Sequence, residues 1–311
     1  MKSSGIGGQA VMEGIMMRNG SEYSVAVRKE NGEIEVKKET YKGVGSKCKL
    51  FRLPFIRGIF SFVDSLVLGM KSLNYSASLF MEDGEEEEEP GRFEKWLQKK
   101  FGDKAEKVIM DLTMVISIIL AMGIFMVFPT WVSTLMKPLL GNGIWMALFE
   151  GVLRIAIFIA YVGLISLMPD IKRTYMYHGA EHKCINCIEH GLPLTVENVM
   201  KSSKEHKRCG TSFLLIVMVI SILFFLVIRP KTLWLRLVSR ILLIPVIAGV
   251  SFEFLRLAGN SDNPVVNLLS KPGLMLQGLT TKEPDEKMAE VAICAVEAVF
   301  DWKAYEEANF N

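Results

Sequence analysis

The sequence predicts a mainly α-helical membrane protein with about four transmembrane helices, an N-terminal β-hairpin and cytosolic helical elements. Half of the 311 residues are hydrophobic and the mean hydropathy is +0.29, yet 23% of the residues are charged. Such a chain is too apolar for disorder and too polar for a bare bundle of spanning helices. We therefore expect one part of the chain in lipid and another part in water.

Charge and cysteine content exclude several classes of protein. The formal net charge of +2 gives no bulk attraction to nucleic acid, so no direct DNA binding is expected. Five cysteines in a chain of this length are not the dense set of a secreted disulfide-bonded domain, which favours a reducing compartment. Residues 1–20 contain charged residues and five glycines but no uninterrupted apolar core, unlike a cleavable signal peptide.

Residues 1–48 are expected to be a glycine-rich segment followed by a β-hairpin in water. Within residues 21–40, two runs of alternating apolar and polar residues flank Asn31-Gly32, a pair that tolerates the positive φ angles of a tight turn. The alternating apolar residues are Val25, Val27, Ile34 and Val36.

Residues 49–81 are apolar but are interrupted by Arg57, Asp64 and Lys71. About 20 apolar residues are needed to cross a bilayer, so an amphipathic or re-entrant helix is preferred to a span. A core helix of the water-exposed part is the alternative. Residues 82–106 begin with an acidic run, which indicates a solvated linker that leads to a juxtamembrane helix.

A four-helix membrane domain is expected over residues 107–260. Glu150 and Arg154 lie four residues apart in its second apolar stretch, on one helical face, where mutual neutralisation accounts for both charges. The four stretches cover residues 111–132, 143–168, 213–228 and 233–252.

The loops indicate the topology. The long polar segment 169–210 lies on the same side of the membrane domain as both termini, and this side carries more lysine and arginine than the other. The positive-inside rule therefore places segment 169–210 and both termini in the cytosol. Residues 261–311 are expected to be a cytosolic helical segment, which ends in an amphipathic helix with an inert Cys294 near its apolar face.

Residues that carry chemistry concentrate in segment 169–210. All four histidines of the chain fall within 29 residues, two of the five cysteines lie in the same window, and a third follows three residues after it. Imidazole and thiolate are preferred protein ligands of zinc, so a metal site is the economical explanation. The seven residues are His178, His182, Cys184, Cys187, His190, His206 and Cys209.

Two sets of ligands compete. His178-Gly-Ala-Glu181-His182 is an H-x-x-E-H pattern, in which two histidines one helical turn apart hold zinc and the glutamate activates water. The other set is a structural Cys₃His site formed by Cys184, Cys187, His206 and Cys209.

Helical phase favours the first set. Taking His178 as zero, His182 lies at about 40°, whereas Cys184 and Cys187 lie at about 240° and about 180°. The two cysteines therefore point away from the histidine face, and His190, at about 120°, is interpreted as a bystander.

Further ligands are expected to return from downstream. Thr195 can cap a helix that runs to about Glu205, which brings His206 and Cys209 back to the histidine face. Cys209 then stands at the N-terminus of the third apolar stretch, where the helix dipole favours a thiolate. The predicted metal ligands are His178, His182, His206 and Cys209, and the predicted ion is zinc.

Blocks spread over nearly the whole chain carry a resemblance to a known family. They are GGQAVMEGIMMR (7–18), YHGAEHK (177–183), LTVENV (194–199), RCGTSF (208–213), PGL (272–274) and LTTKEP (279–284). Together they resemble the YqhQ-like family of bacterial polytopic membrane proteins, which are commonly labelled predicted metal-dependent enzymes. The resemblance implies a bacterial inner-membrane location, and it directs attention to Gln9, Glu13 and Arg18 as residues near the cytosolic site.

Two functions are compatible with these patterns. In the first, a membrane-embedded zinc enzyme hydrolyses an amide or ester at the cytosolic membrane surface, and Glu181 or Glu189 takes the proton of an activated water. In the second, a closed metal site or polar network pins the cytosolic loop of a non-enzymatic factor. Besides the lipid bilayer, such a factor would meet a large partner such as the ribosome or the protein-insertion machinery.

Overall fold

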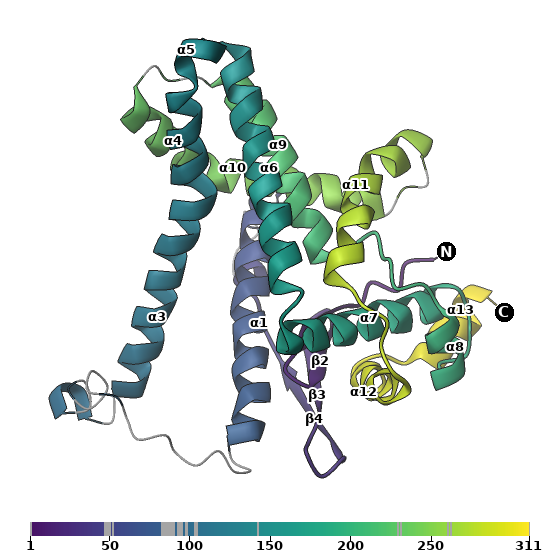
Figure 1. Ribbon diagram of the computed structural model, residues 1–311. Coiled ribbons are helices and arrows are strands. Elements are labelled where there is room, and N and C mark those ends of the chain that lie inside the picture. Colours follow the sequence, from purple (N-terminus) through teal and green to yellow (C-terminus); the bar gives the residue numbers. More distant parts are fainter. Residues whose placement is uncertain are drawn as a thin grey trace.

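The computed structural model describes residues 2–46, 51, 53–81, 91, 96, 99–102, 105–141, 143–228, 230, 232–259, 261 and 263–310. Long apolar helices form one end of the molecule, and a β-sheet covered by helices forms the other (Figure 1). This arrangement confirms the predicted fold class. The acidic linker expected after residue 81 lies outside the described residues.

The N-terminal sheet has four antiparallel strands in sequence order. They are β1 (Gly7–Val11), β2 (Gly14–Asn19), β3 (Glu22–Arg28) and β4 (Ile34–Thr40). The expected hairpin is β3–β4, and within its turn Gly32 has a positive φ of 88°. The glycine-rich segment in front of it forms a second hairpin, which the pattern did not predict because glycine weakens a strand signal. Gly14 is required there, since a Cβ would lie 2.3 Å from the Ala26 carbonyl oxygen.

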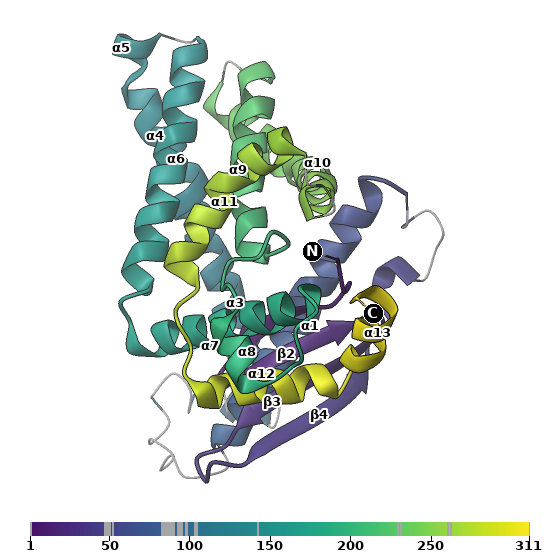
Figure 2. The same cartoon turned by 90° about the vertical axis from the view of Figure 1, so that its right-hand side faces the viewer.

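Both faces of the sheet are covered, as Figure 2 shows. One face packs against α7 (Pro169–Glu189) and α12 (Glu286–Glu297), and the other packs against α1 (Ile56–Met81). Side chains alternate between the two faces, so Ile15 and Met17 join the first core while Met16 joins the second. The sheet is therefore the layer that connects α7 to α1.

The helix α1 joins the sheet to the membrane domain. Its Leu68 is 1% exposed in the core beneath the sheet, and the carboxylate of Asp64 accepts a hydrogen bond from the Val44 amide at 2.9 Å. Near its start, Nε of Arg57 donates to Oε1 of Glu253 in α10 (Leu233–Gly259) at 2.6 Å. Two of the charges that interrupt residues 49–81 are thus engaged in tertiary contacts.

Among the described residues, four helical spans are long and apolar enough to cross a membrane, which confirms the predicted number. They run over Val108–Leu135, Ile144–Ile165, Gly210–Val227 and Trp234–Gly259. The first consists of α3 (Ala105–Met122), the π-helical segment η4 (Gly123–Val127) and α4 (Phe128–Leu135), followed by the short α5 (Lys137–Leu140). The second is α6 (Ile144–Ile165), the third is α9 (Gly210–Val227), and the fourth belongs to α10.

Four further α-helices complete the described part of the chain. These are α8 (Val196–Lys201), α11 (Pro264–Thr280), α12 and α13 (Trp302–Phe310). Of these, α8 and α12 pack against α7, whereas α11 packs mainly against α9. The apolar face of α12 packs between α7, α8 and the sheet, as the amphipathic pattern predicts. Its buried residues include Met288, Val291, Ala292, Ala295 and Val296, each at most 1% exposed.

Candidate metal centre

The helix α7 carries the H-x-x-E-H pattern. Pro169 stands in its first turn, where a missing amide hydrogen costs no hydrogen bond, and Gly191 follows its end with a positive φ of 70°. The helix is continuous between these points, so His178 and His182 project from one face one turn apart.

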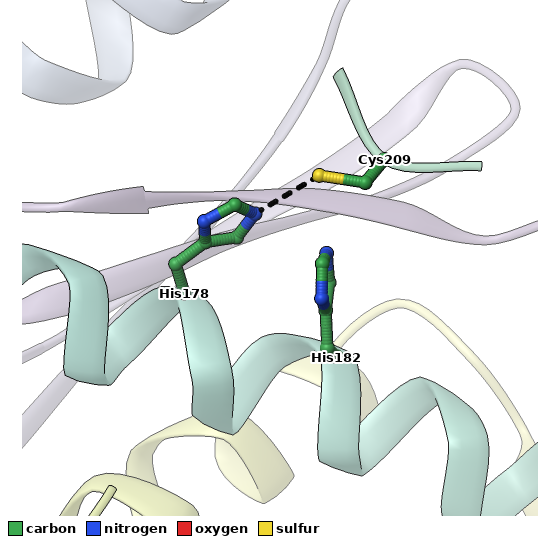
Figure 3. A group of neighbouring side chains, drawn as sticks. All are labelled: His178, His182 and Cys209. Carbon is green, nitrogen blue, oxygen red and sulfur yellow. Dashed lines mark hydrogen bonds between the residues drawn. The ribbon is translucent and has the colours of Figure 1, made fainter. Parts of the chain in front are cut away.

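His178, His182 and Cys209 point toward one another (Figure 3). Their ligand atoms all lie within 4.8 Å of one another, and Nε2 of His178 is 3.3 Å from Sγ of Cys209. The two imidazole centroids are 4.4 Å apart. Zinc binds such atoms at about 2.0–2.3 Å in a tetrahedral arrangement, which places the ligand atoms roughly 3.5 Å apart. The three side chains can therefore hold one ion.

Each histidine of this triad is held in one tautomer. Nδ1 of His178 lies 2.8 Å from the Thr280 carbonyl oxygen, and Nδ1 of His182 lies 2.6 Å from the Lys204 carbonyl oxygen. A carbonyl oxygen accepts hydrogen bonds and cannot donate them, so both Nδ1 atoms carry the proton. Both Nε2 atoms consequently present a lone pair, which is the arrangement of histidines that bind metals.

Cys209 is the N-cap residue of α9. Its Sγ accepts a hydrogen bond from the Thr211 amide at 3.4 Å and lies 3.1 Å from the Thr211 hydroxyl. Donors and the positive end of a helix dipole stabilise a thiolate, the form of cysteine that binds metal. The position at the end of a candidate span also places this ligand at the boundary of the membrane domain.

Gly179 explains why Thr280 reaches His178. A Cβ on Gly179 would lie 2.0 Å from the Lys282 carbonyl oxygen, so only glycine admits the segment after α11 at this distance. The Lys282 amide then donates to the Tyr175 carbonyl at 2.9 Å, which fixes this segment along α7. The glycine within the H-x-x-E-H pattern therefore has a direct structural use.

Polar side chains of α7 hold the loop that carries Lys204. Nζ of Lys183 donates to the carbonyls of Met200 and Ser202 at 2.8 and 2.9 Å. Nδ2 of Asn186 donates to the carbonyls of Ser203 and Glu205 at 2.6 and 2.9 Å. Lys183 and Asn186, which lie on the same helix as His182, thus position the loop whose Lys204 carbonyl orients His182.

Gln277 of α11 fixes the backbone just before Cys209. Its Oε1 accepts from the His206 amide at 2.9 Å, and its Nε2 donates to the His206 carbonyl at 2.8 Å and to the Ser212 hydroxyl at 2.8 Å. The side chain is fully buried, so these bonds satisfy polar atoms that have no access to water. Gln277 therefore sets the position of the loop that presents the thiol.

Glu181 is buried beside the histidines. Its Oε2 lies 3.5 Å from Nε2 of His182. Burial raises the pKa of Glu181, although His178, His206 and the Gly8 amide act in the opposite direction. Strand β1 reaches this carboxyl because Gly8 has no side chain; a Cβ there would lie 2.8 Å from Cγ of Glu181. A carboxyl with a raised pKa is suited to exchange a proton near neutral pH.

Glu189 and His206 form a separate polar group at the end of α7. Oε1 of Glu189 accepts from the amide and hydroxyl of Ser4 at 2.7 and 2.8 Å and pairs with Arg208. Its Oε2 lies 3.4 Å from Nε2 of His206. Burial favours a higher pKa of Glu189, but His206, Arg208 and Ser4 outweigh this effect and lower the pKa to about 2. The group of ligand atoms that lie within 4.8 Å of one another does not include His206, whose Nε2 faces Glu189 and whose ring centroid is 5.7 Å from that of His182.

The structure does not assemble the alternative Cys₃His set. Cys184 and Cys187 are fully buried in the core that α7 forms with α12, and Sγ of Cys187 contacts the Leu192 and Pro193 carbonyls at 3.6 Å. Burial raises the pKa of both thiols, which opposes metal binding. They point away from His178, as helical phase predicts.

The three N-terminal residues associated with the family resemblance lie in different places. Glu13 pairs with Arg173 in the first half of α7. Gln9 packs against α1, where a Cβ on Gly69 would lie 2.4 Å from its Oε1. Arg18 donates to the Gly20 carbonyl at 2.8 Å. The N-terminal contact with the triad region is instead made by the backbone of β1.

Sequence reasoning missed the residues that orient the triad. Thr280 and Lys204 act through their backbone carbonyls. Every residue type has such a carbonyl, so the sequence does not reveal this role. Gln277 could have been noticed in the sequence, because its side chain is an amide within an otherwise apolar stretch of α11. Gly8 and Gly179 were visible as glycines, but their close contacts involve distant segments.

Comparisons with known proteins identify a family and assign no activity. A family model described as "Protein of unknown function (DUF1385)" matches residues 53–302. The chain is 36% identical over 304 residues to the uncharacterized protein YqhQ of Bacillus subtilis (strain 168), and this alignment covers 97% of the chain and 94% of that relative. No solved structure matches.

Proposed function

The chain belongs to the family of unknown function DUF1385, and we propose that it is a membrane-embedded zinc-dependent hydrolase. One observation carries this proposal: three ligand atoms converge while the Nδ1 atoms of His178 and His182 are committed to backbone carbonyls. Nothing in the packing of α7 requires the half-buried imidazole of His178 and the buried imidazole of His182 to face a thiol. A shared cation gives all three groups a partner.

Zinc suits this set of ligands. Imidazole nitrogen and thiolate sulfur are both common zinc ligands, and three protein ligands leave a fourth position for water or substrate. Zinc in such a site lowers the pKa of a bound water to about 7 and polarises a carbonyl group.

The two glutamates take different roles in this proposal. Glu181 lies against His182 and accepts the proton released at the open position. Glu189 is engaged by Ser4 and Arg208, so we assign it to positioning the loop in front of Cys209. His206 belongs with Glu189 and leaves the fourth coordination position open.

The site is proposed to face the cytosol at the surface of a bacterial cell membrane. Cys209 caps a candidate span, which supports a position close to the lipid headgroups. The surplus of lysine and arginine at this end of the membrane domain supports the cytosolic side. The proposed substrate is an amide or ester presented at that surface.

A closed structural site is the second candidate function, and burial favours it. His182 is 2% exposed and Cys209 is 5% exposed, so access to the triad is restricted. In this case the metal pins the loop of a non-enzymatic membrane factor, an accessory to a large partner such as the ribosome or the protein-insertion machinery.

Cobalt(II) substitution separates the two candidates. The full chain, purified in mild detergent, should bind one equivalent of Co²⁺ with a sulfur-to-cobalt charge-transfer band. Acetohydroxamate should then change the spectrum, because an open position accepts an external ligand. A cobalt spectrum that stays unchanged when acetohydroxamate is added would reject the hydrolase and favour the closed site. Failure to bind Co²⁺ or Zn²⁺ would reject both.

A further inference from the structure

A cavity of about 590 Å³ lies at the end of the membrane domain opposite to α7. In Figure 1 this is the end marked by α5. Residues of α6, α9 and α10 and of the adjoining loops line it, and the polar ones among them are mostly cationic. The charged lining residues are Lys137, Glu150, Arg154, Arg236 and Arg240.

Glu150 is the centre of a buried cluster in this cavity. Its Oε1 accepts from Nη2 of Arg154 at 3.0 Å and from Nη2 of Arg240 at 2.5 Å. The hydroxyls of Thr130 and Ser133, on α4, lie 3.0 and 3.2 Å from its carboxylate oxygens. The expectation that Glu150 and Arg154 neutralise each other is therefore incomplete, because a second arginine arrives from α10.

The cluster carries more positive than negative charge. Glu150, Arg154 and Arg240 are 3%, 8% and 4% exposed, so one buried carboxylate faces two buried guanidinium groups. Arg236 and Lys137 line the same cavity and add to the surplus. A surplus of charge in an apolar domain is unfavourable unless a counter-ion is present.

Three guanidinium nitrogens in this cavity have no partner among the described residues. They are Nε of Arg154, Nη1 of Arg236 and Nε of Arg240, and each is buried. The ring of Phe225 lies beneath two of these guanidinium groups, 5.3 Å from that of Arg154 and 5.0 Å from that of Arg240. The ring holds the planar groups in place and leaves their edges as donors.

We propose that this cavity binds a phosphate group. Planar guanidinium groups from different helices suit an anion with several oxygens, and arginine pairs with phosphate through paired hydrogen bonds. Glu150 already pairs with Arg154 and Arg240 on one side of the cluster, and these two arginines and Arg236 line the remaining space of the cavity. A tetrahedral anion can meet donors that arrive from two helices at once.

The position of the cavity suits two sources of phosphate. Along α6 it extends from Gly143 to Arg154, about 15 Å of helix, which reaches from the end of the span toward its middle. A phospholipid headgroup can enter from the membrane side, and a soluble phosphate compound can enter from the aqueous end. The same arginines recognise either.

Binding can be measured on the full chain, purified in mild detergent and stripped of lipid. Native mass spectrometry with phosphatidylglycerol tests the lipid source, with an uncharged diacyl glycolipid as the lipid without phosphate. Equilibrium dialysis against labelled inorganic phosphate tests the soluble source. Arg236→Gln is the informative variant because Arg236 is only half-buried. Its replacement keeps the ion pairs that Glu150 makes with Arg154 and Arg240. Arg256→Gln removes the same charge from the other end of α10 and is the matched control.

Retention of phosphatidylglycerol over the glycolipid would assign a lipid headgroup. Binding of inorganic phosphate without that preference would assign a soluble compound. In either case Arg236→Gln should weaken binding about tenfold or more, and Arg256→Gln should leave it unchanged. Three results would overturn the proposal. The first is equal binding by wild type and Arg236→Gln. The second is equal retention of both lipids without phosphate binding, and the third is no binding at all.

Discussion

Nε2 of His178 lies 3.3 Å from Sγ of Cys209, although 31 residues separate them in the chain. The contact joins the middle of α7 to the N-cap residue of a candidate membrane span. Three other contacts hold the triad: Thr280, the last residue of α11, orients His178, the loop before α9 orients His182, and Gln277 fixes the backbone before Cys209. The predictions below test whether this arrangement is a metal centre and what holds it.

The choice of cysteine distinguishes the triad from the alternative Cys₃His set. Cys209→Ser should lower the bound zinc of the purified protein from about one equivalent to near zero, because it removes one of three ligands. Cys187→Ser should leave the zinc content unchanged. Elemental analysis after gel filtration measures both. The reverse result would restore the cysteine-rich site.

Gly179→Ala should weaken zinc binding although it touches no ligand. The added methyl group would lie 2.0 Å from the Lys282 carbonyl oxygen, so the segment that carries Thr280 must move and His178 loses its orientation. Loss of such a supporting contact lowers metal affinity about 10- to 100-fold. Competition with a chromophoric chelator measures the affinity. Gly278→Ala, at a helical glycine with open space around it, is the control and should keep wild-type affinity.

Gln277→Leu should destabilise the protein by about 2 kcal/mol or more. The change leaves the buried His206 amide without a partner among the described residues and leaves the His206 carbonyl only the 3.4 Å bond from the Cys209 amide, and an unpaired buried group costs about 1–3 kcal/mol. Thermal unfolding in detergent, followed by circular dichroism, measures the loss. Unchanged stability would show that the loop before Cys209 is held by other contacts.

Removal of the metal should lower the melting temperature. An ion that binds the folded state stabilises it, by about 2.7 kcal/mol when its free concentration is 100 times the dissociation constant. A chelator should therefore lower the melting temperature of the wild type and leave that of Cys209→Ser unchanged. Equal responses of the two proteins would indicate a nonspecific effect of the chelator.

Stability should fall in acid through the contact between the sheet and α1. Hydrogen bonds from Lys71, Tyr23 and Lys37 lower the pKa of Glu39 from 4.5 to about 2. A carboxylate with a lowered pKa in the folded state contributes stability above its unfolded pKa, and this contribution disappears as the pH falls from about 4.5 to about 2.

The contribution of Glu39 is expected to be about 1 kcal/mol, because the residue is partly open to solvent and surface ion pairs are screened. Unfolding of the wild type and of Glu39→Gln, compared at pH values within and above this window, measures it. The variant should lose less stability than the wild type on acidification. Parallel losses would assign the acid sensitivity to other carboxylates.

Local patterns were sufficient for much of the fold. The four spans follow from the length of apolar runs, and β3–β4 follows from alternation around Asn31-Gly32. Within α7, the spacing of His178 and His182 and the opposite orientation of Cys184 depend on 3.6 residues per turn, a property of the helix itself. These features are settled by neighbours within one element, which is why periodicity reveals them.

Tertiary packing decided the rest, because it brings together segments whose patterns do not refer to one another. Whether Cys209 or His206 faces His178 depends on where α9 begins. It also depends on the hydrogen bonds that Gln277, more than 60 residues further along the chain, makes with the His206 backbone. Arg240 joins Glu150 only because α10 packs against α9, which packs in turn against α6. The histidine tautomers depend on backbone carbonyls, which every residue possesses, so the tautomers could not be predicted from residue type. The sequence thus specifies which donors each helix presents, and the packing of helices and sheet selects the donors that meet.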